Sequence, residues 1–276
     1  MAFSVNTNSS ALSALRNLNM TTTSLEKTQT HINTGLQISS AKDNAAIYSI
    51  AQKLRADLRG YNAVKQSLDR AVSTTDIALA AAGSISDLLI DMKEKAVASA
   101  DKGQDSRSRA ALTEDFNKLR DQIATIISNA SFNGTNLINN GTDAVMAITN
   151  PDATQTVSIS HQNLTLGGGN IMLSASQTID TASKAAAMVT ALSSSLDNVN
   201  SVLTSLGAGA RALDLQRTFA DTLADTLETG IGNLVDADMA KESAKLQALQ
   251  VKQQLGVQAL SIANKAPQAV LNLFQG

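Results

Sequence analysis

The apolar residues of this chain recur mainly at steps of three and four, the period of helices that pack against one another. Five segments show this period: residues 11–36, 44–101, 106–129, 180–234 and 236–264. The steps are close to a seven-residue repeat, which is typical of coiled coils. A segment of about 50 helical residues would be ~75 Å long. The pattern therefore predicts long helices in mutual contact.

The middle segments carry the strongest apolar seams. Nearly every seam position of 180–234 is apolar, and Arg217 is the exception. Two such segments that flank a short insertion most simply fold back antiparallel into a rod, with both chain ends at one tip. We expect the core of the rod to contain Leu54, Leu58, Leu68, Val72, Leu79, Leu112, Phe116, Leu119, Leu192, Leu196, Val199, Leu203 and Leu206.

The two ends of the chain repeat the pattern more weakly. Near the start, Leu18, Leu25 and Ile32 recur every seven residues, but polar residues alternate with them along the seam, at Thr22 and Gln29. Helices with so few apolar contacts are marginal alone. We therefore expect both ends to bury their stripes against other copies of the chain, through Leu12, Leu15, Leu18, Leu25, Ile32, Leu246, Leu249, Leu255, Leu260 and Ile262.

Residues 132–178 differ from the rest because they are rich in Asn, Gly, Thr and Ser. Short apolar runs interrupt them, at 157–159, 164–166 and 171–173. Such runs between turn residues predict two to four short strands or hairpins. The expected fold class is therefore mainly α, with long antiparallel coiled-coil helices that form a rod and a small β-hairpin insertion.

Composition narrows the possible functions. The formal net charge of -2 provides no strong attraction to nucleic acid or to an acidic membrane surface. The chain has no cysteine, which excludes disulfides, thiolate catalysis and cysteine-bound metals. No apolar run approaches the ~18 residues of a membrane-spanning helix. The start of the chain lacks a basic leader with an apolar core, so we expect a cytoplasmic protein or one exported without cleavage.

The sequence offers no constellation for catalysis, cofactor binding or metal binding. His31 and His161 stand alone, without further histidines or cysteines to complete a ligand set. The acidic residues Asp236 and Asp238 precede a helix and are better explained as caps than as a catalytic pair. The many Ser and Thr residues of 142–183 fit a polar loop surface, and an O-glycan acceptor region is the alternative. We therefore expect no enzyme and no cofactor.

Several sequence strings resemble bacterial flagellin. They are residues 32–35 (Ile-Asn-Thr-Gly), 40–46 (Ser-Ala-Lys-Asp-Asn-Ala-Ala), 132–134 (Phe-Asn-Gly), 233–238 (Asn-Leu-Val-Asp-Ala-Asp) and 259–264 (Ala-Leu-Ser-Ile-Ala-Asn). They occur in the order and at the spacing of the family, and the likeness covers most of the chain except about 140–180. The short length and the wording of 233–243 are similar to compact alphaproteobacterial flagellins, which lack large outer domains.

The resemblance implies a subunit of the flagellar filament. In the family, both terminal segments are disordered in the monomer and become a coaxial helical tube in the filament. Here they correspond to 1–43 and 235–276, and the rod domain corresponds to 44–234. The implied partners are other copies of the chain, paralogous flagellins, an export chaperone, and the hook–filament junction and filament cap proteins. The implied location is the extracellular filament, reached through the flagellar type III apparatus without a cleaved signal.

One family site matches poorly. The rod-domain surface that the flagellin-sensing Toll-like receptor recognises carries an Arg, a Leu and a Glu in the family, where this chain has Asp91, Lys95 and Gln122. The mismatch predicts weak activation of that receptor.

Two other assignments remain open at this point. A hook–filament junction protein shares related terminal helices, although it normally has a longer and more diverse middle region. A secreted helical effector or adhesin would fail to polymerise when seeded. An enzyme is the least supported class, because no catalytic constellation is present.

Overall fold

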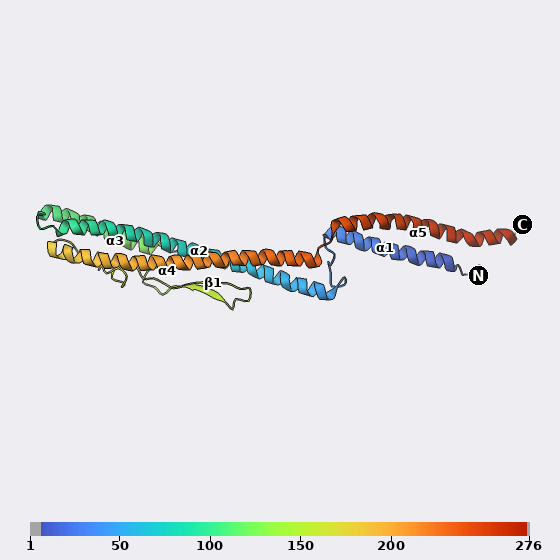
Figure 1. The fold of residues 1–276 in the computed structure, drawn as a ribbon, viewed down its shortest axis with the longest axis horizontal. Coiled ribbons are helices and arrows are strands. Elements are labelled where there is room, and N and C mark those ends of the chain that lie inside the picture. The colour runs from blue at the N-terminus through green and yellow to red at the C-terminus, as the bar shows by residue number, and fades with distance from the viewer. Residues whose placement is uncertain (1–6, 275–276) are drawn as a thin grey trace. The chain divides into compact units, whose positions relative to one another are not determined.

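The computed structural model describes the backbone of residues 7–274 and the side chains of residues 7–265. This part of the chain folds into the helices α1 (Ser9–Thr34), α2 (Ala45–Ala100), α3 (Ser106–Asn129), α4 (Ala182–Val235) and α5 (Met239–Phe274) (Figure 1). The strands β1 (Val145–Ile148) and β2 (Thr156–Ile159) lie between α3 and α4. The predicted fold class, mainly α with long helices and a small hairpin, is confirmed.

The chain divides into two compact units. The first takes in both ends of the chain, with Ala56 and Thr226 as its inner limits, and the second is Asp57–Asp225. Helices α2 and α4 contribute to both units. The domain limits that the sequence suggested, 1–43 with 235–276 and 44–234, stay a prediction.

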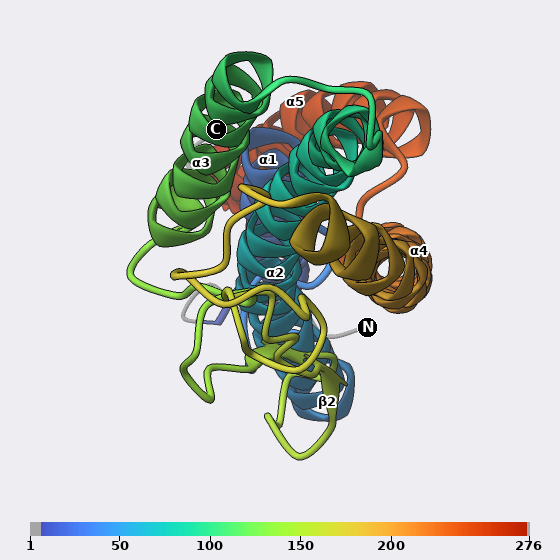
Figure 2. The ribbon, with the colours of Figure 1, turned by 90° about the vertical axis from the view of Figure 1, so that its left-hand side faces the viewer.

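In the second unit, α3 and α4 flank α2, and the hairpin region covers a further side of it (Figure 2). Helices α2 and α4 run antiparallel, because Asp69 pairs with Arg217 and Lys65 pairs with Asp221. The Arg217 side chain is about half exposed and its Nε lies 2.8 Å from Asp69 Oδ1. The charged residue in the seam of α4 thus lies at the rim of the helix contact.

One hydrophobic cluster forms the core of the second unit, and its buried members run from Val64 to Ala220. The expected core residues divide into three groups. Those fully buried in the cluster are Leu68, Phe116, Leu192, Val199 and Leu206. Those partly buried against it are Val72, Leu79, Leu112, Leu119, Leu196 and Leu203. Leu54 and Leu58 are half-buried and lie outside the cluster.

The hairpin has two strands, the lower limit of the two to four that the sequence pattern predicts. Strands β1 and β2 pair antiparallel, with Val145 opposite Ile159 and Ile148 opposite Thr156. The runs 164–166 and 171–173 form only the isolated bridge between Leu166 and Ile171. Side-chain contacts satisfy this backbone instead, because Asn163 Oδ1 accepts a hydrogen bond from Thr165 N at 3.0 Å. Such local bonds compete with ladder formation.

The helix ends follow the expected chemistry. Asn8 caps α1 by accepting a hydrogen bond from Ala11 N at 3.0 Å, and Gly35 ends the helix in the left-handed conformation, with φ of 71°. Of the two acidic residues before α5, Asp238 is the cap, since its Oδ1 accepts from Ala240 N and Lys241 N at 3.0 Å each.

Candidate functional site

The two terminal helices α1 and α5 lie side by side and antiparallel in the first unit (Figure 1). Asn8 Nδ2, just before the start of α1, donates to Ala263 O in the C-terminal half of α5, at 2.8 Å. Midway, Leu18 packs against Gly256 so closely that an added Cβ on the glycine would lie 3.1 Å from Leu18 Cδ1. These contacts show which residues of the two helices face each other.

The contact face of α1 differs by one position from the expected seam. The heptad leucines Leu18 and Leu25 do face α5, but Gln29 is exposed and Thr28 is completely buried. The small residues Ala14, Thr21 and Thr28 are half-buried or buried beside the leucines, and Thr22 is half-buried as well, whereas Leu15 and Gln29 are exposed. Small side chains let the two helix backbones come close, which a seam of Leu15 and Gln29 would prevent.

The ten residues expected to join neighbouring copies fall into two groups. Leu18, Leu25, Ile32, Leu246, Leu249 and Leu260 are buried or half-buried within the single chain. The other four side chains are exposed, by 50% for Leu12, 42% for Leu15, 57% for Leu255 and 71% for Ile262. Contacts between copies stay a prediction for the whole set.

Helix α5 carries apolar residues on two opposite faces. Glu242, Leu249 and Leu260 lie on the face toward α1, while Val251, Leu255 and Ile262 are exposed. Because the exposed residues are separated by four and seven positions, they form one stripe, and it points away from α1. Val251 was missed in the sequence, although its spacing to Leu255 and Ile262 could have revealed it. We call Val251, Leu255 and Ile262 the outer stripe.

A shallow cavity of about 430 Å³ lies where the start of α1 meets the part of α5 around Leu260. Its lining mixes apolar and polar side chains: Thr7, Asn8, Ala11, Leu12, Leu15, Leu260 and Asn264. The exposed Leu12 and Leu15 thus border a depression next to α5. This gives the first unit a second apolar surface that no described residue covers.

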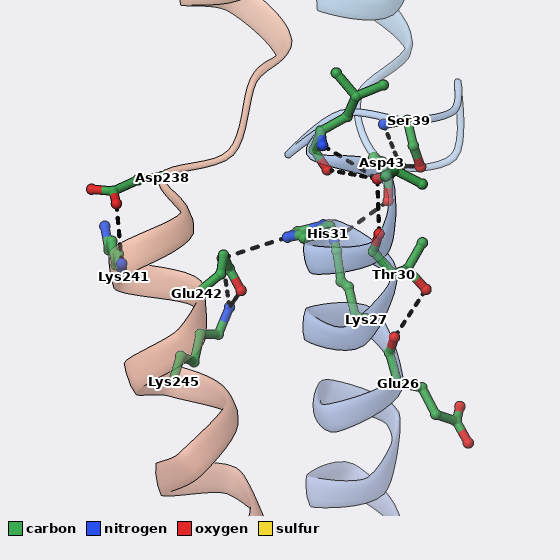
Figure 3. A network of polar contacts seen from close by, with 12 residues as sticks. Glu26, Lys27, Thr30, His31, Ser39, Asp43, Asp238, Lys241, Glu242 and Lys245 are labelled. Carbon is green, nitrogen blue, oxygen red and sulfur yellow. Dashed lines mark hydrogen bonds and ion pairs between the residues drawn. The ribbon is translucent and has the colours of Figure 1, made fainter.

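The other end of the α1–α5 contact is polar. His31 on α1 is only 5% exposed, Glu242 on α5 is 8% exposed, and His31 Nδ1 lies 3.5 Å from Glu242 Oε1. Lys245 Nζ approaches the same carboxylate at 3.4 Å (Figure 3). Burial alone would raise the pKa of Glu242, but the contacts with His31 and Lys245 outweigh it and lower this pKa.

The two linkers that leave α1 and enter α5 are tied together by backbone hydrogen bonds. Gln37 N donates to Val235 O at 2.7 Å, and Ala237 N donates to Gly35 O at 2.9 Å. In the first linker, Asp43 Oδ2 accepts from both Ser39 N and Ser40 N. Burial alone would raise the pKa of Asp43, but the hydrogen bonds from Ser40 and Ser39 lower it by more, so the net shift of this pKa is downward.

The described residues offer little for chemistry at a bound group. Among them, no cluster of three or more His, Asp or Glu side chains is placed to hold a metal ion. His161 lies in the second unit, where its Nε2 is 3.3 Å from Asn139 Oδ1. No helix in the described part of the chain is both long enough and apolar enough to cross a membrane.

Comparisons with known proteins agree along almost the whole chain. Residues 5–143 match the bacterial flagellin N-terminal helical region, and residues 189–274 match the C-terminal helical region. Flagellin FljM of Caulobacter vibrioides is 48% identical over 272 residues, which cover 99% of this chain and 98% of the relative. A flagellin of Brucella melitensis is 37% identical, with 99% of each chain covered.

Among solved structures, one from Vibrio parahaemolyticus, described as a flagellar hook-associated protein, superposes with a TM-score of 0.58. It covers 70% of this chain and 100% of its own, at 14% identity. At that identity the likeness concerns the fold alone.

Proposed function

The chain belongs to the bacterial flagellin family and is a structural subunit of the flagellar filament, and we propose that its copies join through the exposed apolar surfaces of α1 and α5. The family's relatives cover nearly the whole chain, so the subunit has the size of the compact flagellins that it resembles. The filament is an extracellular appendage, and the mechanical function lies in contacts between subunits.

The outer stripe of α5 is the observation that carries this proposal. A helix that covers one side of a single partner needs only one apolar face. Helix α5 has a second face, and its members Val251, Leu255 and Ile262 are each more than half exposed. Together with Leu12 and Leu15 beside the cavity, this surface fits neighbouring subunits.

Contacts between different surfaces of neighbouring copies produce an open helical polymer when the rotation from one copy to the next does not close a ring. Each added subunit also stabilises its neighbours by mass action, because binding favours the folded state. The weak seam of α1 and α5 fits this scheme, since the docked pair gains its full set of apolar contacts only inside the polymer.

The hook–filament junction alternative rests on fold likeness alone, at 14% identity. The flagellin relatives are far more similar and span both ends of the chain. These relatives therefore favour the filament subunit over the junction protein.

Finer partners follow from family membership. We infer that paralogous flagellins, the flagellar export chaperone, the junction proteins and the cap protein act on this chain, and that the type III apparatus exports it uncleaved. Co-purification of the unassembled chain with the chaperone of the same bacterium tests the chaperone contact. Absence of a complex at micromolar concentrations would contradict it.

We also infer weak activation of the flagellin-sensing Toll-like receptor. Asp91 on α2 and Gln122 on α3 are exposed, and Lys95 is half-buried. Compared with the family's Arg, Leu and Glu, this set reverses one charge, introduces a positive charge and removes a negative one. Purified monomer should give a weak response in receptor reporter cells, and a strong response would contradict the inference.

A double substitution tests the assembly surface. Leu255→Ser with Ile262→Ser replaces two members of the outer stripe without touching the α1 side of α5. We expect seeded solutions of this variant to form no filaments in electron micrographs. The control is Met146→Ser, which changes an exposed apolar side chain on the hairpin of the second unit. Normal filaments from the double variant would overturn the proposal.

A further inference from the structure

The apolar seam between α1 and α5 does not by itself specify one register. On α1, Leu18, Leu25 and Ile32 repeat every seven residues. On α5, Leu246 and Leu260 occupy one row with Gln253 between them. If the helices slid by one heptad, leucines would again meet apolar or small residues, so slipped pairings would compete.

The buried polar end of the seam does distinguish registers. His31 and Glu242 are each less than 10% exposed, and their nearest polar atoms are 3.5 Å apart. Neither nitrogen of His31 has a hydrogen-bond partner among the described residues, and the only ion-pair contact given for this side chain there is the one with Glu242. A slip by one heptad would separate the two and leave a carboxylate and an imidazole buried without each other, which is strongly unfavourable.

The surrounding charges leave this pairing intact. Lys245, on the same helix as Glu242, is about half exposed and reaches the carboxylate from the solvent side. Lys27, one turn before His31 on α1, points instead to Asp43 in the linker, with Nζ 3.6 Å from Oδ1. Figure 3 shows His31 as the side chain that crosses from α1 to Glu242.

We infer that His31 and Glu242 are specificity-determining residues that set the register in which α1 docks on α5. The matched register is the one in which both buried polar groups meet. Its consequence for assembly rests on the proposed function, because the outer stripe of α5 and the exposed leucines of α1 present a repeatable surface to neighbours only when the two helices hold one register.

Distance measurements between spin labels test the register directly. The chain has no cysteine, so single cysteines at the exposed Ser13 and Ser243 accept labels without competition. These sites lie far apart along the helix pair, and a slip of one heptad changes their axial offset by about 10 Å. A small fraction of doubly labelled chains would be mixed into unlabelled filaments.

Two variants of the labelled chain distinguish a register set by His31 and Glu242 from a register set by apolar packing alone. The swap His31→Glu with Glu242→His keeps one imidazole and one carboxylate facing each other, and we expect it to retain the single distance of the unsubstituted chain. The double substitution His31→Leu with Glu242→Leu keeps apolar packing but removes both polar groups. We expect it to show a second population of label distances, displaced by about 10 Å. Helix content by circular dichroism verifies that each variant folds.

A single unchanged distance in the leucine variant would overturn the inference, because packing alone would then fix the register. Loss of the single distance in the swap variant would also overturn it, since an imidazole and a carboxylate facing each other would then not set the register. Failure of the unsubstituted chain to polymerise would instead refute the proposed function.

Discussion

At the scale of single residues, side chains of the same type differ in how much they contribute to the stability of the second unit. Phe116 on α3 is fully buried in the core of the second unit, whereas Phe219 on α4 is 56% exposed. The same residue type therefore occupies opposite environments in one unit, which gives a matched pair for measurement.

Phe116→Ala should lower the free energy of unfolding of the second unit by about 3–5 kcal/mol, because it removes a buried ring and leaves a cavity. Phe219→Ala should change it by no more than about 0.5 kcal/mol, as is usual for exposed positions. Chemical denaturation of the monomer, followed by circular dichroism, measures both. Equal effects of the two substitutions would show that the buried position of Phe116 is wrong.

Two glycines inside α2 form a second matched pair. An added Cβ at Gly60 would lie 2.5 Å from Pro151 Cβ, whereas at Gly83 it would meet nothing within 4 Å. Gly83→Ala should stabilise the second unit by roughly 0.5–1 kcal/mol, because alanine favours the helix. Gly60→Ala should destabilise it, since the rigid proline ring must move. The same denaturation experiment decides, and a gain from both substitutions would contradict the Gly60–Pro151 contact.

At the scale of elements, the helices could be predicted because their period reports directly which face is buried. Leu68, Phe116 and Leu206 were expected in the core and are fully buried. The strands could not be counted in the same way. Ile171 and Leu173 are buried and Met172 is exposed, as in a strand, but Met172 N donates to the Ser195 hydroxyl at 2.9 Å. The alternation of apolar and polar residues therefore indicated which side chains are buried, but not which segments pair as strands.

The terminal helices show a related limit of the sequence. Thr28 is polar in composition yet completely buried beneath α5, so the pattern placed the seam of α1 one position away, on Gln29. The outer stripe of α5 was partly expected through Leu255 and Ile262. Only the position of α1 shows which apolar residues of α5 face inward and which form the outer stripe, and the pattern of one helix alone does not contain that information.

The contact between α1 and α5 should weaken in acid because of Glu242. Its pKa is lowered in the folded chain, so the stabilisation is present above the ordinary value of 4.5 and is lost as the pH falls below it. Glu242→Gln should therefore reduce filament stability most near neutral pH. The difference from the unsubstituted protein should shrink as the pH falls below 4.5.

Light scattering of filaments across that pH range measures this effect. Glu26→Gln is the control, because Glu26 is exposed on α1, so its filaments should follow those of the unsubstituted chain. A constant difference at every pH for Glu242→Gln would show that ionisation of this carboxyl contributes nothing to docking.

At the scale of the whole molecule, stability is unevenly divided between the two units. The hydrophobic cluster from Val64 to Ala220 lies entirely within the second unit. In the described part of the first unit, the buried apolar side chains are fewer and scattered: Leu25, Ile38, Ala51, Ile231, Val235 and Leu249. We therefore expect the second unit to fold from its own contacts, and the terminal helices to need partners to complete theirs.

Removal of residues 250–276 tests this division. The truncation takes away the outer stripe and the α5 residues opposite the first half of α1, but no member of the hydrophobic cluster. We expect no filaments in electron micrographs after seeding, together with an unchanged unfolding midpoint for the second unit. Normal filaments would show that the outer stripe is dispensable. A lowered midpoint would show that the second unit depends on α5.

Phe116→Ala should give the reciprocal result, a lower midpoint with the outer stripe intact, because folding of the core and joining of copies depend on different residues.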